Sequence, residues 1–211
     1  MLEKKKIMDD YIWSIIFRYQ LLSSNNHQLG ILPSIIELLK KDYLLKGECF
    51  ASAINSTLNI YCSIYDDLEN NFGSFGNFFN NTFIEGTFTF NPPYQKKIID
   101  LGFKKILYHL NEASSNNKKL SFFLTIPVWD KEGQNIINCN NKIDYGEFDV
   151  IQLIKNCNFF KGLRIILKED FTYIDHNFKL LKNKTIQNTY FILLSSDDIS
   201  FDKVHTYNFY S

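Results

Sequence analysis

The sequence predicts an α/β fold in which helices alternate with the strands of a mostly parallel sheet. Residues 120–128, LSFFLTIPV, are a continuous apolar run, which is typical of a central strand buried on both faces. Residues 86–90 alternate threonine and phenylalanine as a strand does, and residues 95–113 carry apolar side chains at helical spacing. Strands separated by helices favour a layered α/β architecture.

The other elements follow in chain order. Residues 5–22 have the apolar spacing of an amphipathic helix, and Pro33 stands where a second helix, ending near Lys41, can start. We then expect a strand at 47–50, a small-residue turn at 51–55, a strand at 59–65 and a loop with exposed phenylalanines at 66–81. On the 95–113 helix the expected apolar side is Ile98, Leu101, Ile106 and Leu110. After the apolar run come a loop at 130–146, a helix near 147–157, and strands at 161–168 and 187–195.

Composition limits the possible functions. The 211 residues carry 23 basic and 23 acidic side chains, so a polyanion has to be held by a local patch. No apolar run is long enough for a membrane span, and the start has no signal-peptide core. The four cysteines are far apart and show no metal spacing. We expect an intracellular protein without a membrane segment or metal.

Two segments fall where ligands bind in open α/β sheets, at the carboxyl ends of strands. The first is GECFASAIN, residues 47–55, where Ala51 and Ser52 allow the backbone to approach a ligand closely. Asp66 or Asp67, after the next predicted strand, is placed to bind ribose hydroxyls. The same pattern also fits a tight packing turn, because the glycine-rich dinucleotide fingerprint is absent.

The second segment is Asn91-Pro92-Pro93-Tyr94, in which the proline pair fixes a rigid, extended turn. The Asn91 side-chain oxygen and the Pro92 carbonyl can each accept one N–H of the adenine amino group. The Tyr94 ring can stack on a flipped-out base, a contact worth about 1–3 kcal/mol. A rigid loop with a packed aromatic ring is the structural alternative.

A short basic cluster lies at residues 179–184, KLLKNK. Lys179, Lys182 and Lys184 can meet RNA phosphates, although such a cluster is more often a solvated face.

Together these motifs are similar to the phosphorylated CTD-interacting factor family. The resemblance runs through most of residues 12–196 and rests on GECFASAIN, YCSIYDD, FGSFG, GTFTFNPPY, LSFFLTIPVW and IQNTYFILL, in this order. It implies a Rossmann-like S-adenosylmethionine-dependent methyltransferase fold with a short N-terminal helical extension. It also implies N6 methylation of the cap-adjacent adenosine of mRNA. The expected division is an extension over 1–45 and one methyltransferase domain over 46–211.

By position, the resemblance assigns catalysis to Asn91, Pro92, Pro93 and Tyr94. It also assigns the cofactor-side loop to Phe50, Ala51, Ser52 and Asn55. With Glu48, Asp67 and Asn91 added, these residues are the expected cofactor-binding set. The chain departs from the animal enzymes in having Tyr94 for phenylalanine and Ala53 for proline, and in lacking a WW domain. The Tyr94 hydroxyl is therefore expected to be dispensable, and polymerase-tail binding is not expected.

The leading hypothesis is an enzyme that uses S-adenosyl-L-methionine to methylate adenine in RNA, with the capped 5′ end of mRNA as partner. Methylation of DNA adenine is the alternative within enzymes, because the motif reads the base and not the sugar. A non-catalytic RNA-binding subunit is the alternative outside enzymes.

Overall fold

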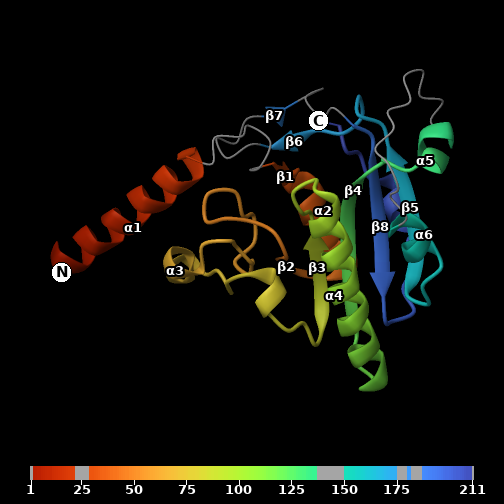
Figure 1. The fold of residues 1–211 in the computed structure, drawn as a ribbon, viewed down its shortest axis with the longest axis horizontal. Helices are drawn as coiled ribbons and strands as arrows, with labels where there is room; N and C mark the ends of the chain where they lie inside the picture. Colours follow the sequence, from red (N-terminus) through yellow and green to blue (C-terminus); the bar gives the residue numbers. More distant parts are fainter. Residues whose placement is uncertain (1, 22–28, 137–149, 175–179, 182–186, 211) are drawn as a thin grey trace.

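The computed structural model describes residues 2–21, 29–136, 150–174, 180–181 and 187–210, and Figure 1 shows their arrangement. Their centre is a five-stranded sheet with the strand order β2-β3-β4-β8-β5. The strands are β2 (Leu45–Glu48), β3 (Gly86–Phe90), β4 (Leu120–Pro127), β5 (Phe160–Ile166) and β8 (Thr189–Ser195). Each of the five was predicted from the sequence, with bounds that differ by no more than two residues.

The sheet is mixed. β2, β3 and β4 pair in parallel, whereas β8 is antiparallel to both of its neighbours, β4 and β5. Four strands therefore run in one direction and β8 runs in the other. The α/β class is confirmed, but the expectation of mostly parallel pairing holds only for one side of the sheet. In the described part of 167–188 there are two short strands and no helix, and antiparallel neighbours need no helical crossover.

Four of the six helices in the described residues lie where the sequence predicts them, although the buried side of one was wrongly assigned, and the other two lie in segments predicted as loops. They are α1 (Leu2–Leu21), α2 (Pro33–Tyr43), α3 (Asp66–Glu69), α4 (Lys96–Ser115), α5 (Lys131–Ile136) and α6 (Val150–Lys155). α2 begins at Pro33, as predicted. On α4 the buried side includes Ile99, Phe103 and Ile106, whereas Leu101, expected there, is 46% exposed. α5 lies in a segment predicted as loop.

The central strands carry a core on each face. On β4, Phe122 and Leu124 face the cluster that includes α4 and α6, while Phe123 faces the cluster that includes α2. β8 alternates in the same way, with Tyr190 on the first side and Phe191 on the second. This alternation follows from the two-residue period of a strand, and it explains why both strands read as continuous apolar runs.

A second, three-stranded antiparallel sheet covers the α2 side with the order β1-β6-β7. Its strands are β1 (Gly30–Ile31), β6 (Tyr173–Ile174) and β7 (Leu180–Leu181). Each has two residues, too few to show a periodic pattern, so the sequence does not predict them. Ile31 and Tyr173 join the α2 cluster, and so do apolar side chains around the short 3₁₀ helix η3 (Asp202–Thr206).

The segment between β2 and β3 differs most from the prediction. The strand expected at 59–65 is reduced to Tyr61, which forms single parallel bridges with Glu48 and Ser74. The loop expected at 66–81 contains α3 and the 3₁₀ turns η1 (Asn70–Phe72) and η2 (Phe78–Asn80). Phe78, expected to be exposed, is buried, while Phe75 is exposed. η1 ends at Gly73, which adopts a positive φ, and η2 begins after Asn77, whose side chain accepts a hydrogen bond from the Phe79 amide.

Helix α1 extends away from the sheet and meets the remainder of the chain near α3 (Figure 1). Of its described side chains, Ile15 and Tyr19 are buried, and they form a small cluster with Leu68 of α3. Trp13 and Phe17, on another side of the helix, are exposed. No helix in the described ranges is both long and apolar enough to cross a membrane.

Candidate active site at the carboxyl edge of the sheet

β3 brings the Asn91–Tyr94 motif to the carboxyl edge of the sheet. The strand lies between β2 and β4 and is parallel to both. Its last residue, Phe90, is fully buried, and the next residue, Asn91, is half-buried. Pro92 is buried behind Asn91, while Pro93 and Tyr94 are half-buried. The motif is therefore fixed at its base and accessible at its tip.

Helix α4 packs directly on the end of β3 because residue 102 is a glycine. A Cβ atom on Gly102 would lie 2.3 Å from Cζ of Phe90, far inside any normal contact. The helix and the strand thus approach each other closely just before the motif, and the base of the turn cannot shift without moving Phe90.

The Asn91 side chain has a defined orientation. Its Nδ2 donates a hydrogen bond of 3.0 Å to the backbone carbonyl of Leu29, next to β1. The amide nitrogen is thereby used within the protein, and the side-chain oxygen is the group left to accept a hydrogen bond. Within the described residues, no donor reaches that oxygen.

The Tyr94 side chain is held at both its ring and its hydroxyl. The ring packs edge-on against Trp129, with 6.2 Å between the ring centroids. The hydroxyl lies 2.6 Å from the hydroxyl of Tyr173 in β6 and 3.5 Å from the Oγ1 of Thr189 in β8. Burial raises the pKa of the Tyr94 hydroxyl, so it stays protonated and can act as donor or acceptor. The hydroxyl, expected to be dispensable, has a buried partner.

The turn after β2 lies beside this motif. β2 and β3 are adjacent and parallel, and the Cys49 amide donates to the Thr89 carbonyl at 2.8 Å. The turn is closed by its own polar groups, since the amide and the hydroxyl of Ser52 both donate to Oδ1 of Asn55. We call residues 50–55 the cofactor-side turn. The structure therefore brings the two predicted segments to one edge, as parallel strand order requires.

Phe50, at the start of the cofactor-side turn, belongs to an aromatic cluster. Its ring centroid lies 5.2 Å from those of both Phe78 and Phe90. Ala51 follows with a half-buried side chain, and its amide donates to the Cys62 carbonyl at 2.9 Å. The cluster anchors the start of the turn, and the small side chain of Ala51 leaves the backbone approachable.

Glu48 is assigned to cofactor binding by the sequence, but its carboxylate faces the segment after the turn. Oε1 accepts hydrogen bonds from the hydroxyl of Ser56 and from the amides of Thr57 and Leu58, at 3.0, 2.9 and 3.2 Å. Burial raises the pKa of Glu48, and these hydrogen bonds act in the opposite direction. The contacts give Glu48 a role in shaping the loop.

Asp67, the other predicted acid, is exposed and pairs with Arg18 of α1. The two side chains form a bidentate contact at 2.9 and 2.8 Å, and the hydrogen bond from Arg18 lowers the pKa of Asp67. The side chain of the neighbouring Asp66 lies next to Gly76, and its carboxylate has no partner among the described residues.

Glu69 is a buried acid at the site that sequence reasoning missed. Its exposed fraction is 0%, and Oε2 accepts a 2.6 Å hydrogen bond from the amide of Ala53 in the cofactor-side turn. Oε1 accepts a second hydrogen bond from the hydroxyl of Tyr19 in α1. A glutamate in an acidic stretch gives no signal of such a role, because only the fold turns it inward.

Lys179, Lys182 and Lys184 lie outside the described residues. Leu180–Leu181, between them in the sequence, forms β7 and pairs with β6, the strand of the Tyr94 partner Tyr173. No group of side chains in the described part of the chain could hold a metal ion.

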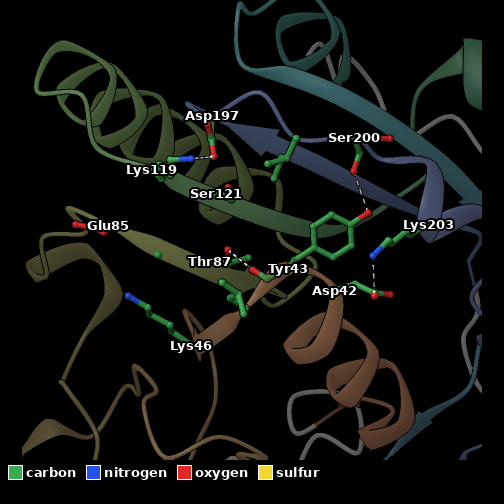
Figure 2. A pocket seen from close by; sticks show the side chains of 13 residues that line it. Asp42, Tyr43, Lys46, Glu85, Thr87, Lys119, Ser121, Asp197, Ser200 and Lys203 are labelled. Atoms are coloured by element: carbon green, nitrogen blue, oxygen red, sulfur yellow. Dashed lines mark hydrogen bonds and ion pairs between the residues drawn. The ribbon is translucent and has the colours of Figure 1, made fainter.

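A hollow of about 490 Å³ lies at the opposite edge of the sheet, and Figure 2 shows its side chains. It includes Thr87 and Ser121, from the amino-terminal ends of β3 and β4. Two of its acids are paired: Asp197 with Lys119 at 2.9 Å and Asp42 with Lys203 at 3.0 Å. The parallel strands point away from this hollow, so it is separate from the candidate site.

A family model described as "Phosphorylated CTD interacting factor 1 WW domain" matches residues 1–162, more than half of the chain. The chain belongs to this family. The resemblance predicted from the motifs is confirmed, and the match includes both the cofactor-side turn and the Asn91–Tyr94 motif. The description names a WW domain, whereas the matched residues of this family member form α1 to α6 and the start of β5 of an α/β fold.

Two curated relatives carry the same name, "mRNA (2'-O-methyladenosine-N(6)-)-methyltransferase". The Mus musculus protein is 32% identical over 127 residues, and the Homo sapiens protein is 31% identical over 127 residues. Each alignment covers 56% of this chain and 17% of the relative. The chain thus corresponds to a small part of these longer relatives of the phosphorylated CTD-interacting factor family.

Proposed function

We propose that the chain is an S-adenosyl-L-methionine-dependent enzyme that methylates the N6 amino group of adenine in RNA, most specifically the cap-adjacent adenosine of mRNA. Family membership and the names of the two relatives support this reaction. The observation that carries the proposal is the orientation of Asn91. Its nitrogen is bound to the Leu29 carbonyl, so its oxygen is available as acceptor at the carboxyl edge of the sheet.

In this proposal the motif positions the adenine amino group. The Asn91 oxygen and the Pro92 carbonyl each accept one of its N–H groups and so direct the nitrogen lone pair. The Tyr94 ring supplies an aromatic face for a flipped-out base. The side chain is already fixed by Trp129 and Tyr173, so little ordering is left for binding. Such an arrangement acts by positioning and by preorganised electrostatics.

The residues of the cofactor-side turn fit S-adenosyl-L-methionine. The backbone at Ala51 is open to close approach, and the polar groups of Ser52 and Asn55 bond to each other and hold the turn's shape. When bound, the cofactor supplies an electrophilic methyl group. Asp66 is better placed than Asp67 to accept hydrogen bonds from ribose hydroxyls, because Arg18 already occupies the Asp67 carboxylate.

We further infer a Rossmann-like arrangement of the domain. Three adjacent parallel strands, β2, β3 and β4, support it, together with the crossover of α4 between β3 and β4 and the layers on both faces of the sheet. In such folds ligands bind outside the carboxyl ends of the strands, which is where the two motifs meet.

The test offers the purified chain three substrates with labelled S-adenosyl-L-methionine: capped RNA beginning with 2′-O-methyladenosine, the same RNA without a cap, and single-stranded DNA. Digestion to nucleosides identifies the product. We expect N6-methylated adenosine from the capped RNA, and none from an Asn91→Ala variant. Equal methylation of all three substrates contradicts the cap preference, and absence of transfer to any of them contradicts the enzymatic proposal.

A further inference from the structure

Glu69 connects two parts of the chain that are far apart in sequence. Its two carboxylate oxygens accept from the Tyr19 hydroxyl of α1 and from the Ala53 amide of the cofactor-side turn. The carboxylate is fully buried, and a buried charge is tolerated only when hydrogen bonds compensate for the lost water. The contacts with Tyr19 and Ala53, together with the Ser63 hydroxyl, supply this compensation.

Apolar packing joins the same elements. Ile15 and Tyr19 of α1 are buried with Leu68 of α3, and Ala53 and Ile54 of the cofactor-side turn pack against that cluster. α1 and the turn thus share one apolar cluster, and Glu69 links them by hydrogen bonds. Its Tyr19 ring also lies edge-on to Tyr65, with 5.3 Å between the ring centroids.

The hydrogen bond to Glu69 helps to fix the tip of the turn. Ser52 and Asn55 bond to each other, which preserves the turn's shape. Two backbone amides of the turn bond to other parts of the chain: Ala51 donates to the Cys62 carbonyl, and Ala53 donates to Glu69. Of these two anchors, only Glu69 is itself held by α1.

We propose that Glu69 is a positioning residue through which helix α1 sets the conformation of the cofactor-side turn and hence the affinity for S-adenosyl-L-methionine. This inference rests on the proposed function, since it assigns the cofactor to that turn. α1 is then a part of the cofactor site although it offers no ligand. A change in α1 that releases Tyr19 weakens cofactor binding without altering any residue in contact with the cofactor.

The test compares variants of the full chain by two measurements. Calorimetric titration with S-adenosylhomocysteine gives the Kd, and amide hydrogen exchange over residues 51–56 reports the order of the turn without any ligand. We expect Glu69→Ala to raise the Kd by about tenfold, as loss of a hydrogen bond to a charged group implies. Tyr19→Phe, which removes only the hydrogen bond from α1 to Glu69, should raise the Kd by about threefold. Both variants should exchange faster in the turn.

Glu69→Gln is the conservative variant. Its amide oxygen can accept from the Ala53 amide while its NH₂ donates to the Tyr19 oxygen, so both measurements should stay near wild type. Tyr207→Phe is the matched control, because it removes a 2.9 Å hydrogen bond from a tyrosine to Asp42 beside the hollow at the opposite edge. It should change unfolding in urea but neither the Kd nor the exchange of the turn.

Three results separate the proposals. If Glu69→Gln binds as weakly as Glu69→Ala, the negative charge itself is required and the positioning role is wrong. If Glu69→Ala and Tyr19→Phe lower only the free energy of unfolding, as Tyr207→Phe does, the role is merely structural. If the wild type does not bind S-adenosylhomocysteine, the cofactor assignment and the affinity claim both fail. Hydrogen exchange then shows separately whether Glu69 and α1 order the turn. If Glu69→Ala does not fold, the comparison of Tyr19→Phe with Tyr207→Phe tests the proposal, because only Tyr19→Phe should change the Kd and the exchange of the turn.

Discussion

The hydroxyls of Tyr94 and Tyr173 lie 2.6 Å apart, which fastens the aromatic residue of the candidate catalytic motif to strand β6, 79 residues further along the chain. Both hydroxyls are buried, and burial raises the pKa of each. The Asn91 amide is bound to the carbonyl of Leu29, next to β1, the partner strand of β6. The small sheet of β1 and β6 therefore holds the motif from the side opposite α4.

Tyr94→Phe should lower the free energy of unfolding by about 1 kcal/mol, because it leaves the buried Tyr173 hydroxyl without this partner. Urea denaturation measures the loss. Tyr173→Phe should cost a similar amount, and the double variant should cost less than the sum of the two, since both single changes break the same bond. Additive losses contradict the coupling.

The effect of Tyr94 on methyl transfer is a separate prediction. Because stacking requires the ring and not the hydroxyl, Tyr94→Phe should retain most of the transfer to RNA, whereas Tyr94→Ala should lose nearly all of it. The labelled-nucleoside assay decides between them, under conditions where both variants are folded. If the two variants are equally impaired, the hydroxyl takes part in the reaction.

Asn91→Ala should abolish most methyl transfer while the Kd for S-adenosylhomocysteine changes little. The reason is that the amide oxygen orients the adenine amino group, whereas the cofactor is held mainly by residues 50–55. Asn111→Ala is the matched control, because the exposed Asn111 side chain makes the same type of bond, 2.9 Å to the Leu107 carbonyl, on α4. Turnover near the wild-type rate in Asn91→Ala contradicts the catalytic role assigned to Asn91.

His109 should make the protein less stable in mild acid. Burial lowers its pKa in the folded state, nearby Lys105 lowers it further, and Nε2 is without a partner in the described part of the chain. As pH falls below about 6.5, the unfolded chain takes up a proton that the folded His109 resists, so the free energy of unfolding falls.

Urea unfolding at a series of pH values between about 7.5 and 5 checks this prediction. His109→Asn should remove part of the loss of stability below about pH 6.5. The comparison uses the slope against pH, because the smaller side chain also changes the absolute stability. An unchanged slope in His109→Asn contradicts the prediction.

Replacing Lys179, Lys182 and Lys184 together by glutamine should weaken RNA binding and leave cofactor binding intact. Each lost phosphate contact should reduce the slope of log K against log salt by about 0.7 for single-stranded RNA. The pairing of β7 with β6, which carries the Tyr94 partner, supports this choice of lysines. RNA titrations at several salt concentrations measure the slope. Titration curves identical to those of the wild type indicate that RNA binds elsewhere on the protein. Lys96 and Lys97, at the start of α4, are then the next candidates.

The sequence by itself determined the α/β class, the five central strands and the start of α2 at Pro33. These features follow from local rules, since periodicity, continuous apolar runs and proline geometry act over a few residues. It also placed the cofactor-side turn and the Asn91–Tyr94 motif at one edge, because the carboxyl ends of adjacent parallel strands necessarily meet there. No comparable local pattern predicts the short strands β1, β6 and β7, and none indicates that residues 59–65 do not form a strand.

Only the tertiary structure decided how the site is held. Glu69 reads as one of several acids in a polar stretch, yet it is buried between α1 and the cofactor-side turn. The Tyr94 hydroxyl, expected to be dispensable, meets a tyrosine from a two-residue strand. The antiparallel direction of β8 likewise depends on its pairing with β4 and β5. In each case the partner lies many residues away, and a hydrogen bond between distant groups depends on the packing of the whole fold and leaves no mark in local sequence.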